Sequence, residues 1–431
     1  MIQHDKITVL GGGESGVGAA LLAKKYKKDV FVSDYGKIAE KYKSILLKYN
    51  IPFEEEGHDF ERLKDAEIIV KSPGISNKTQ VVKFLNKLDK VLVSEIEYGS
   101  WFYDGKVIAI TGSNGKTTTT KLIHHILSSA GLQVEIGGNI GDSFCKILSK
   151  DNIADTMILE ISSFQLDDVN RFKADIGVLL NITADHLDRY EYNIQNYANA
   201  KCKIWSNMEA TDLMIVNADD ELSDQRLDSC NAELVKIPEN VEDHKINAQL
   251  KGKHNAFNIR CAAEVARRCG LSEEEINSAV ISFKPVKHRL ETIAFVNGVE
   301  FINDSKATNT DAVKYAIEGI DKKLVWIAGG TDKGNDYSEL FPLIENKVKT
   351  LICLGLDNNK LKKSFQGKIE NIIESKEMTQ AVELAFKAAS RGDAVLLSPA
   401  CASFDLFNNY EHRGLLFEQA VFGLVKTYYL M

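Results

Sequence analysis

The stretch that decides the fold lies at residues 107–118 and reads Val-Ile-Ala-Ile-Thr-Gly-Ser-Asn-Gly-Lys-Thr-Thr. A β-branched run leads into a glycine-rich turn, which ends in Lys116 and Thr117 at the head of a predicted helix. Such a unit suits a phosphate-binding loop, because glycines let backbone N–H groups converge on phosphate oxygens at a helix N-terminus. Lys116 would reach the β- and γ-phosphates, and the Thr117 hydroxyl would bind Mg²⁺. An ATP-using enzyme is therefore the first hypothesis.

The loop departs from the commonest phosphate-loop pattern at one position. The pattern G-x-x-x-x-G-K-[ST] would place a glycine where this chain has Ile110, so the loop has the shorter form T-G-S-N-G-K-T-T. The structural alternative is an ordinary strand–turn–helix junction with an accidental Gly-Lys pair. The flanking apolar strand and the helix that follows favour the phosphate loop.

Composition limits the classes of protein to which the chain belongs. A length of 431 residues is too great for one hydrophobic core and suggests about three domains. A net charge of −8 argues against a non-specific nucleic-acid binder, which needs a basic excess to neutralise phosphates. Seven cysteines without a C-x-x-C pair indicate neither a disulfide framework nor a zinc cluster. We expect a reducing compartment and no nucleic-acid partner.

Targeting and membrane signals are not expected. Residues 1–6 lead directly into a predicted strand and lack the apolar core of a signal peptide. No apolar run approaches the length of a transmembrane helix. We expect a cytoplasmic monomer that is not inserted in a membrane.

The order of apolar runs predicts an α/β protein with three domains in series. Residues 1–95 would form a Rossmann-like domain, 96–285 a central phosphate-loop ATPase-type domain, and 286–431 a second Rossmann-like domain. The first domain opens with the glycine-rich turn G-G-G-E-S-G, and the third with a hairpin about Asn297-Gly298. Strands are predicted at residues 7–10, 30–33, 67–70, 157–161, 176–180, 213–216, 293–296, 299–302, 324–327, 350–354 and 394–397.

Four polar residues of the central domain are candidates for chemistry. Glu160 ends an apolar strand, where a second Mg²⁺ ligand belongs in a phosphate-loop domain, although a solvated glutamate is the simpler interpretation. His186 stands in a polar cluster after the next strand, which suits a ligand as well as a structural histidine. By themselves, Lys201 would be interpreted as a surface lysine and Asn139 as a turn residue.

Three loops of the third domain combine small residues with a charge directly after a strand. They are N-D-S-K-A-T-N at 303–309, G-G-T-D-K-G at 329–334 and S-P-A-C-A-S-F-D at 398–405. An open α/β sheet binds its ligand at the carboxyl ends of its strands, although three ordinary loops remain the alternative. His288-Arg289 lies at the domain junction, where an arginine would reach a phosphate across a closing cleft.

Taken together, these segments resemble the Mur ligases of peptidoglycan synthesis. The resemblance rests on T-G-S-N-G-K-T-T, G-G-N-I-G, E-I-S-S-F-Q-L, T-A-D-H-L-D-R-Y, H-N-x-x-N, H-R, N-D-S-K-A-T-N and S-P-A-C-A-S-F-D, in this order over nearly the whole chain. Within the family, the match is closest to the members that add D-glutamate to UDP-N-acetylmuramoyl-L-alanine. The resemblance implies an ATP-dependent ligase that converts the muramoyl carboxylate into an acyl phosphate, which an amine then attacks.

For the nucleotide and the metals, the resemblance implies specific residues. ATP would be bound by Gly112, Ser113, Asn114, Gly115, Lys116, Thr117, Thr118, Asn255, Asn258, Arg289 and Asp304. Of these, Asn255 and Asn258 would lie at the adenine and Asp304 at the ribose. Two Mg²⁺ ions, with Mn²⁺ as a substitute, would be bound by Thr117, Glu160, His186 and Lys201. Lys201 would be N-carbamylated, which requires a neutral amine first and turns it into an anionic ligand.

The resemblance also implies catalytic and substrate-binding residues. The catalytic residues would be Lys116, His186, Lys201, Arg289 and Lys306. The UDP-linked substrate would contact Glu14, Ser15, Asp34, Ser72, Pro73, Gly74, Asn139 and Ser162. D-glutamate or the transferring phosphoryl group would contact Lys306, Thr308, Lys333, Ser403 and Tyr410. Two positions depart from the family pattern, because Glu14 places an acid near the expected diphosphate and Tyr410 stands where phenylalanine is expected.

Other classes share part of this pattern. A sibling ligase or a folylpolyglutamate synthase-like enzyme shares the central ATP motifs but not the third-domain loops. An NAD-dependent dehydrogenase would explain the first glycine-rich turn but leaves Lys116, Glu160 and His186 without a role. A non-catalytic nucleotide-binding regulator would be favoured by loss of one of these three residues, and none is lost.

Overall fold

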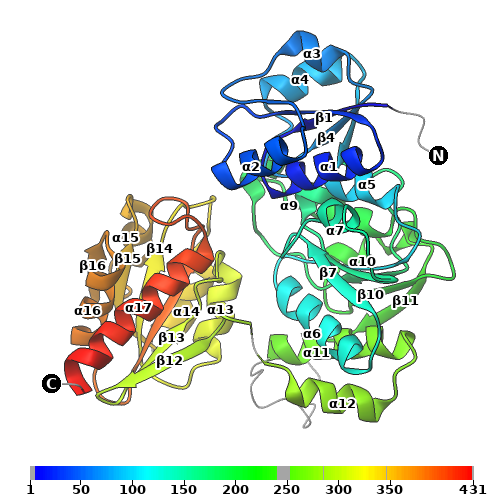
Figure 1. Ribbon diagram of the computed structural model, residues 1–431. Helices are drawn as coiled ribbons and strands as arrows, with labels where there is room; N and C mark the ends of the chain where they lie inside the picture. The colour runs from blue at the N-terminus through cyan, green and yellow to red at the C-terminus, as the bar shows by residue number, and fades with distance from the viewer. Residues whose placement is uncertain (1–4, 240–252, 285, 346, 430–431) are drawn as a thin grey trace. The chain divides into compact units, whose positions relative to one another are not determined.

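The structure is a computed structural model that describes residues 5–239, 253–284, 286–345 and 347–429. The described residues form two compact units. The first runs up to Ile182 and resumes at Asn193 to end at Phe283, apart from Lys253 and His254. The second contains Thr183–Tyr192, Lys253, His254 and the residues from Lys284 onward. Two of the three sheets belong to the first unit and one to the second (Figure 1).

The first sheet confirms the predicted Rossmann-like start. Five parallel strands lie in the order β3-β2-β1-β4-β5, so the order reverses at β1. The strands are β1 (Lys6–Leu10), β2 (Asp29–Ser33), β3 (Phe53–Glu54), β4 (Ile68–Lys71) and β5 (Val91–Ser94). The helices are α1 (Glu14–Lys25), α2 (Glu40–Lys48), α3 (Phe60–Lys64), α4 (Gln80–Lys87) and α5 (Glu95–Ser100). The glycine-rich turn follows β1 and therefore lies at the reversal, where such sheets bind ligands.

The second sheet places the phosphate loop at its centre. Six parallel strands lie in the order β11-β10-β9-β6-β8-β7. They are β6 (Lys106–Thr111), β7 (Val134–Gly138), β8 (Thr156–Glu160), β9 (Ile176–Leu179), β10 (Leu213–Asn217) and β11 (Glu233–Ile237). The helices are α6 (Lys116–Ser129), α7 (Phe144–Leu148), α8 (Ser163–Leu166), α9 (Ile194–Cys202), η2 (Lys203–Trp205), α10 (Glu221–Asp224), η3 (Leu227–Ser229), α11 (Lys253–Arg268) and α12 (Glu273–Ser282). Because β6 pairs with β8 and β9, the loops after these three strands meet at one sheet edge.

Local signals in the central domain behave as predicted. α12 begins with a capping box in which the side chains of Ser272 and Glu275 exchange hydrogen bonds with each other's backbone N–H. α6 ends before Gly131, whose φ of +83° is the left-handed conformation expected after a helix. Both features depend on neighbouring residues only, which is why the sequence predicts them.

The third sheet starts with the predicted hairpin and continues with parallel strands. Its order is β12-β13-β17-β14-β15-β16. The strands are β12 (Glu291–Val296), β13 (Val299–Asn303), β14 (Leu324–Gly329), β15 (Val348–Leu354), β16 (Asn371–Ser375) and β17 (Ala394–Ala400). The helices of this unit are η1 (Leu187–Tyr190), α13 (Thr310–Glu318), η4 (Ser338–Leu340), α14 (Phe341–Ile344), α15 (Asn359–Phe365), α16 (Met378–Ala388) and α17 (Tyr410–Tyr429). The hairpin turn has φ of +48° at Asn297 and +77° at Gly298, as a tight two-residue turn requires.

One boundary in the third sheet was predicted wrongly. We expected a loop from Ser398, but β17 continues to Ala400. Pro399 lacks a backbone N–H, which argues against a central strand. The pairing of β14 with β17 shifts register between Ile327 and Gly329, which accommodates the proline inside the strand. The loop that follows β17 therefore begins at Cys401.

The three sheets confirm the predicted α/β class with three domains in series. The boundary predicted after residue 95 falls at the start of α5 and stays a prediction. The boundary predicted at residue 285 lies outside the described residues. Among the described helices, none combines the length and the apolar character needed to cross a membrane.

Candidate active site

The phosphate loop joins β6 to α6 and is held by neighbouring strands and helices. Gly115 precedes α6 with a φ of +84°, and a Cβ atom at this position would lie 2.6 Å from Asn258 Oδ1. The loop N–H groups of Ser113 and Asn114 donate to the backbone oxygen and the Oδ1 of Asn181, at 2.9 and 2.8 Å. Asn258 belongs to α11, so the residue predicted at the adenine lies directly against the loop.

Two lysines converge on one carbonyl oxygen of this loop. Lys116 Nζ donates to Gly112 O at 2.7 Å and to Ser113 O at 2.9 Å. Lys201 Nζ, from α9, donates to the same Gly112 O at 2.8 Å and lies 4.5 Å from the centre of the Tyr197 ring. Lys201 is 1% exposed, so its interpretation as a surface lysine is wrong. Two lysine amines, one half-buried and one fully buried, therefore share a single acceptor.

Oxygen ligands for a cation meet beside the loop. Thr117 Oγ1 donates to Glu160 Oε2 at 2.6 Å, and Asn139 Nδ2 donates to Glu160 Oε1 at 2.9 Å. Glu160 is 2% exposed, so it is not the solvated strand-end glutamate of the simpler interpretation. A hydroxyl and a carboxylate are the hard oxygen donors that Mg²⁺ prefers. The described residues contain no group of three or more His, Cys, Asp or Glu placed to hold a metal. The pair thus fits part of a Mg²⁺ site.

Two hydroxyls predicted to bind ligands have different surroundings. Ser162 caps α8, since its Oγ donates to Gln165 Oε1 at 3.0 Å and accepts from Gln165 N at 3.4 Å. Its hydroxyl therefore already serves the helix, and the substrate contact stays a prediction. Thr118 Oγ1 is buried and has no hydrogen-bond partner among the described residues.

The glycine-rich turn of the first domain is closed by its own side chains. Gly11 has a φ of +94°, and a Cβ atom there would lie 2.7 Å from Ser72 Oγ. Asp34 Oδ2 accepts from Gly12 N at 2.6 Å, and its Oδ1 accepts from Gly36 N at 2.7 Å. Six of the residues predicted to contact the UDP-linked substrate follow the three strands around the reversal point: Glu14 and Ser15 after β1, Asp34 after β2, and Ser72, Pro73 and Gly74 after β4.

Glu14, the first departure from the family pattern, has a partner of opposite charge. Its Oε1 lies 2.9 Å from Lys146 Nζ of α7, and the same oxygen accepts from Ser143 N at 3.4 Å. Lys146 also pairs with Asp142 at 2.8 Å. The negative charge at the start of α1 is therefore compensated within the first unit.

The third sheet brings its three predicted loops side by side, because β13, β17 and β14 are neighbours and parallel. Lys306 follows β13, and its Nζ lies 5.0 Å from the centre of the Tyr410 ring at the start of α17. Thus Tyr410, the second departure, contacts a predicted catalytic lysine. Ser403 is buried after β17, and Thr308 is half-buried after β13.

Asp304, which is buried, and Arg289, which is half-buried, are two predicted nucleotide ligands whose charges interact. Asp304 accepts from Ser398 Oγ at 2.8 Å and from Leu290 N at 3.3 Å. Burial raises the pKa of Asp304 to about 7, although the charge of Arg289 and the bond from Ser398 oppose the shift. Arg289 Nε is buried without a hydrogen-bond partner among the described residues. An unused buried donor beside a carboxyl suits a site that a polar ligand completes.

Asp185 is a residue that the sequence reasoning did not select. Its Oδ1 lies 2.5 Å from Lys333 Nζ, and its Oδ2 accepts from Asn309 at 3.2 Å and lies 3.7 Å from His186 Nε2. Burial alone would raise its pKa, but the charges of Lys333 and His186 lower the pKa of Asp185 to about 2. The carboxylate thus joins predicted residues from two loops. Its position next to His186 in T-A-D-H-L-D-R-Y was the available signal.

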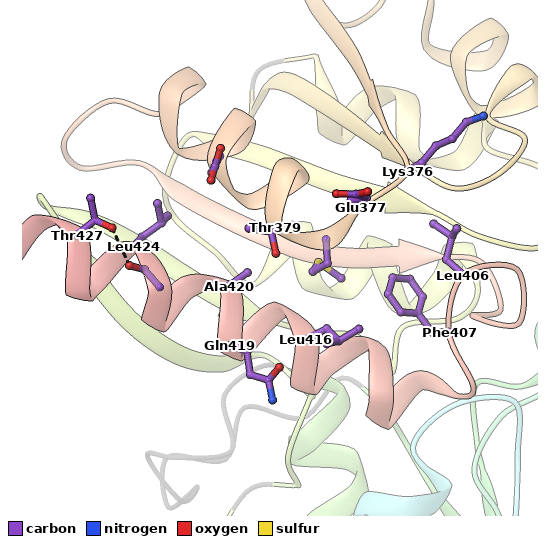
Figure 2. Close-up of a pocket in the computed structure, with 13 residues that line it drawn as sticks. Lys376, Glu377, Thr379, Leu406, Phe407, Leu416, Gln419, Ala420, Leu424 and Thr427 are labelled. Carbon is purple, nitrogen blue, oxygen red and sulfur yellow. Dashed lines mark hydrogen bonds between the residues drawn. The ribbon is translucent and has the colours of Figure 1, made fainter.

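A cavity of about 550 Å³ elsewhere in the second unit contains none of the predicted site residues. It lies between α16 and α17 (Figure 2), and its labelled lining includes Glu377 and Thr379 at the start of α16, Phe407, and Leu416 and Leu424 on α17. Phe407 follows β17, so the hollow lies beside the loop after that strand although none of the predicted site residues lines it.

Family models match most of the chain in the predicted order. The MurD N-terminal domain matches residues 6–81, the Mur ligase middle domain residues 110–237, and the Mur ligase glutamate ligase domain residues 288–401. Proteins named UDP-N-acetylmuramoylalanine–D-glutamate ligase are similar over nearly their whole length. That of Christiangramia forsetii is 44% identical and covers 97% of this chain and 99% of its own. That of Porphyromonas gingivalis is 45% identical, with 97% and 98% covered.

Solved structures confirm the three-domain fold. UDP-N-acetylmuramate–alanine ligase from Thermotoga maritima aligns with a TM-score of 0.62 at 17% identity and covers 97% of this chain and 100% of its own. The MurF ligase of the same organism, solved with ADP, aligns with a TM-score of 0.62 at 16% identity, with 92% and 95% covered. From the domain matches and the full-length identity to curated relatives, the chain belongs to the Mur ligase family, in the branch of the UDP-N-acetylmuramoylalanine–D-glutamate ligases.

Proposed function

We propose that this chain forms an amide bond between D-glutamate and the carboxylate of UDP-N-acetylmuramoyl-L-alanine, at the expense of ATP. The observation that carries the proposal is the cluster of Lys116, Thr117 and Glu160 on the phosphate loop, in a chain whose relatives bear that activity as their name over their full length. ATP supplies the driving force because a carboxylate is a poor electrophile.

The reaction proceeds in two steps. A substrate carboxylate oxygen forms a bond to the γ-phosphorus of ATP, the bond to the β-phosphate oxygen breaks, and ADP leaves. The neutral amine of D-glutamate then attacks the acyl carbon, and inorganic phosphate leaves as the C–N bond forms and the nitrogen loses a proton. Both steps bring anionic oxygens together, so fixed cations lower the barrier most.

The residues of the chain divide this work. Lys116 holds the β- and γ-phosphates, while Asn255 and Asn258 bind the adenine and Asp304 with Arg289 the ribose and phosphates. Two bound Mg²⁺ ions would supply positive charge to the phosphoryl oxygens, held by Thr117 and Glu160 at one position and by His186 and the carbamate of Lys201 at the other. Lys306, Thr308, Lys333, Ser403 and Tyr410 receive D-glutamate or the phosphoryl group. The turn around Gly11, with Glu14, Ser15, Asp34 and Ser72–Gly74, holds the UDP portion together with Asn139.

Carbamylation of Lys201 has a physical motive in the geometry of the loop. Lys116 and Lys201 both donate to Gly112 O, and two ammonium groups at this distance, one of them on the buried Lys201, would repel each other. Addition of CO₂ to the neutral Lys201 amine, with release of a proton, replaces that repulsion by attraction between a carbamate and Lys116. The mass of a trapped carbamate tests this step. A small anion such as chloride should restore activity to a Lys201→Ala variant, and failure of every anion tried would contradict a role for the carbamate charge.

The main experiment measures phosphate release from ATP with UDP-N-acetylmuramoyl-L-alanine and a panel of amino acids. We expect turnover with D-glutamate alone. Turnover with another amino acid would keep the ligase but overturn the assignment of the Lys333 and Ser403 loops. No turnover with any amino acid, despite ATP binding, would favour a folate-type ligase or a nucleotide-binding regulator. We further propose that the enzyme is a monomer and that it acts on its nucleotide-linked substrate in the cytoplasm.

A further inference from the structure

Arg413 is a buried charge for which the proposed reaction has no role. It lies in the first turns of α17 and is 1% exposed. Burying a guanidinium is costly unless its donors are satisfied. Burial lowers the pKa of Arg413 to about 10, so the side chain still carries its charge at neutral pH. The hydrogen-bond partners of the guanidinium indicate why a charge is buried at this position.

The guanidinium reaches all three loops at the strand ends. Its Nη2 donates to Ser305 O at 2.8 Å and its Nε to Ser305 Oγ at 3.0 Å, after β13. Its Nη1 donates to Cys401 O at 3.1 Å, after β17, and to Gly329 O at 3.5 Å, at the end of β14. The acceptors are three backbone carbonyls and one hydroxyl, and all of them are uncharged.

Each acceptor is close in sequence to a residue that receives the amino acid. Ser305 directly precedes Lys306, Cys401 lies two residues before Ser403, and Gly329 opens the turn that carries Lys333. Ser305 Oγ also donates to Tyr410 O at 2.9 Å, which ties the start of α17 to the same point. A single side chain therefore connects the backbone at three loops and one helix.

Another contact joins only two of these loops. Thr331 and Ala402 exchange backbone hydrogen bonds of 2.8 and 3.1 Å, which link the loops after β14 and β17. The loop after β13 is held to α17 by Asn303 Nδ2, which donates to Gly414 O at 2.9 Å. Arg413 is thus the described side chain that bonds all three loops at once.

We propose that Arg413 is a positioning residue that sets the spacing of Lys306, Lys333 and Ser403, and so the affinity for the acceptor amino acid. The inference rests on the proposed function, since it needs those three residues to contact the amino acid. This role requires the planar guanidinium of Arg413, because its five N–H donors can hold several acceptors in fixed directions, whereas the single ammonium of lysine cannot.

The test compares Arg413→Lys with a matched variant of the same helix. Phe417 lies one turn later on α17, is fully buried in the core and touches none of the three loops through a hydrogen bond, so Phe417→Leu weakens the helix packing alone. We expect Arg413→Lys to raise the KM for D-glutamate at least tenfold while the KM for the UDP-linked substrate changes less than twofold. Phe417→Leu should lower the unfolding temperature without changing either KM by more than twofold.

Several outcomes would overturn the inference. An Arg413→Lys enzyme with an unchanged KM for D-glutamate would show that charge or volume alone is needed. An equal KM shift in Phe417→Leu would show a purely structural effect. If Arg413→Lys does not fold, Ser305→Ala removes one acceptor and should raise the same KM about threefold; no change would refute the proposal. If the wild-type protein uses another amino acid, the proposed function fails, and the KM comparison is made with that amino acid.

Discussion

The two glycine-rich loops of the first unit follow the same plan and differ in what stands at the helix start. Each follows a central parallel strand and leads into a helix, α1 or α6. In the first loop, Asp34 occupies the N–H of Gly12, and Glu14 begins the helix with its charge paired to Lys146. In the second, Lys116 begins the helix and lies over the loop carbonyls. Glycines make both turns, but the two helices begin with side chains of opposite charge.

Removing the cation of the second loop should have the largest effect. We expect Lys116→Ala to lower kcat by roughly 10²–10³-fold, because a fixed charge at the transferring phosphoryl group is lost. Lys121 is exposed on the same helix, so Lys121→Ala should keep wild-type kcat. Steady-state phosphate release measures both. More than a tenth of wild-type kcat in Lys116→Ala would show that the two loops do not differ in the way we describe.

Alanine substitutions at two glycines distinguish the effect of crowding at the phosphate loop from the effect of backbone strain. Gly115 and Gly131 have nearly the same φ, +84° and +83°, but only Gly115 has an atom within reach of an added Cβ, Asn258 Oδ1 at 2.6 Å. Either substitution by alanine should cost about 1–2 kcal/mol of unfolding free energy from the left-handed conformation. Gly115→Ala should in addition weaken ADP binding roughly tenfold, since Asn258 must move. Calorimetric titration with equal ADP affinity for the two variants would contradict this.

A buried carboxyl near the first loop should make stability depend on pH. Burial raises the pKa of Glu95 to about 7, with a contribution from the charge of Glu14 and against the hydrogen bonds from Cys145. The folded form then holds a proton that the unfolded chain releases near its ordinary pKa, so stability is greatest at low pH and falls as pH rises to about 7.

We therefore expect Glu95→Gln to be more stable than the wild type at pH 8, by about 1–3 kcal/mol, with the difference vanishing near pH 4. Glu97 is the matched control, because its carboxylate accepts from the N–H groups of Asn170, Arg171 and Phe172. Glu97→Gln should lose stability at pH 8. Chemical unfolding at both pH values measures the free energy of unfolding of each variant. The prediction is refuted if the difference between wild type and Glu95→Gln is the same at pH 4 and at pH 8.

The smallest effect is expected at the start of the first helix. Glu14 and Lys146 are each about one-third exposed, so Glu14→Gln should cost less than about 1 kcal/mol. Because Lys146 already compensates the acid, the KM for the UDP-linked substrate should change less than threefold. A KM that falls tenfold would show that the acid repels the diphosphate. The charge at the helix start would then affect ligand binding in the first loop as well as in the second.

Parts of the site could be predicted because they depend on short stretches of sequence. The phosphate loop, the hairpin at Asn297-Gly298 and the capping box before α12 each follow from the conformational preferences of adjacent residues. The loops of the third sheet could also be predicted, since parallel strands end at one edge. The strand end at Ala400 could not, because a register shift with β14 accommodates Pro399.

By itself the sequence determined the α/β class, the two glycine-rich turns and the residues that resemble a ligase, since local periodicity and spacing carry that information. Tertiary structure alone decided that Lys201 is buried against Gly112, that Asp185 binds Lys333, and that Arg413 joins three loops. The partners in these contacts are separated by 89, 148 and 108 residues. No local preference acts over such separations; only the packing of strands and helices brings these groups together, and burial then requires that their polar atoms be hydrogen-bonded.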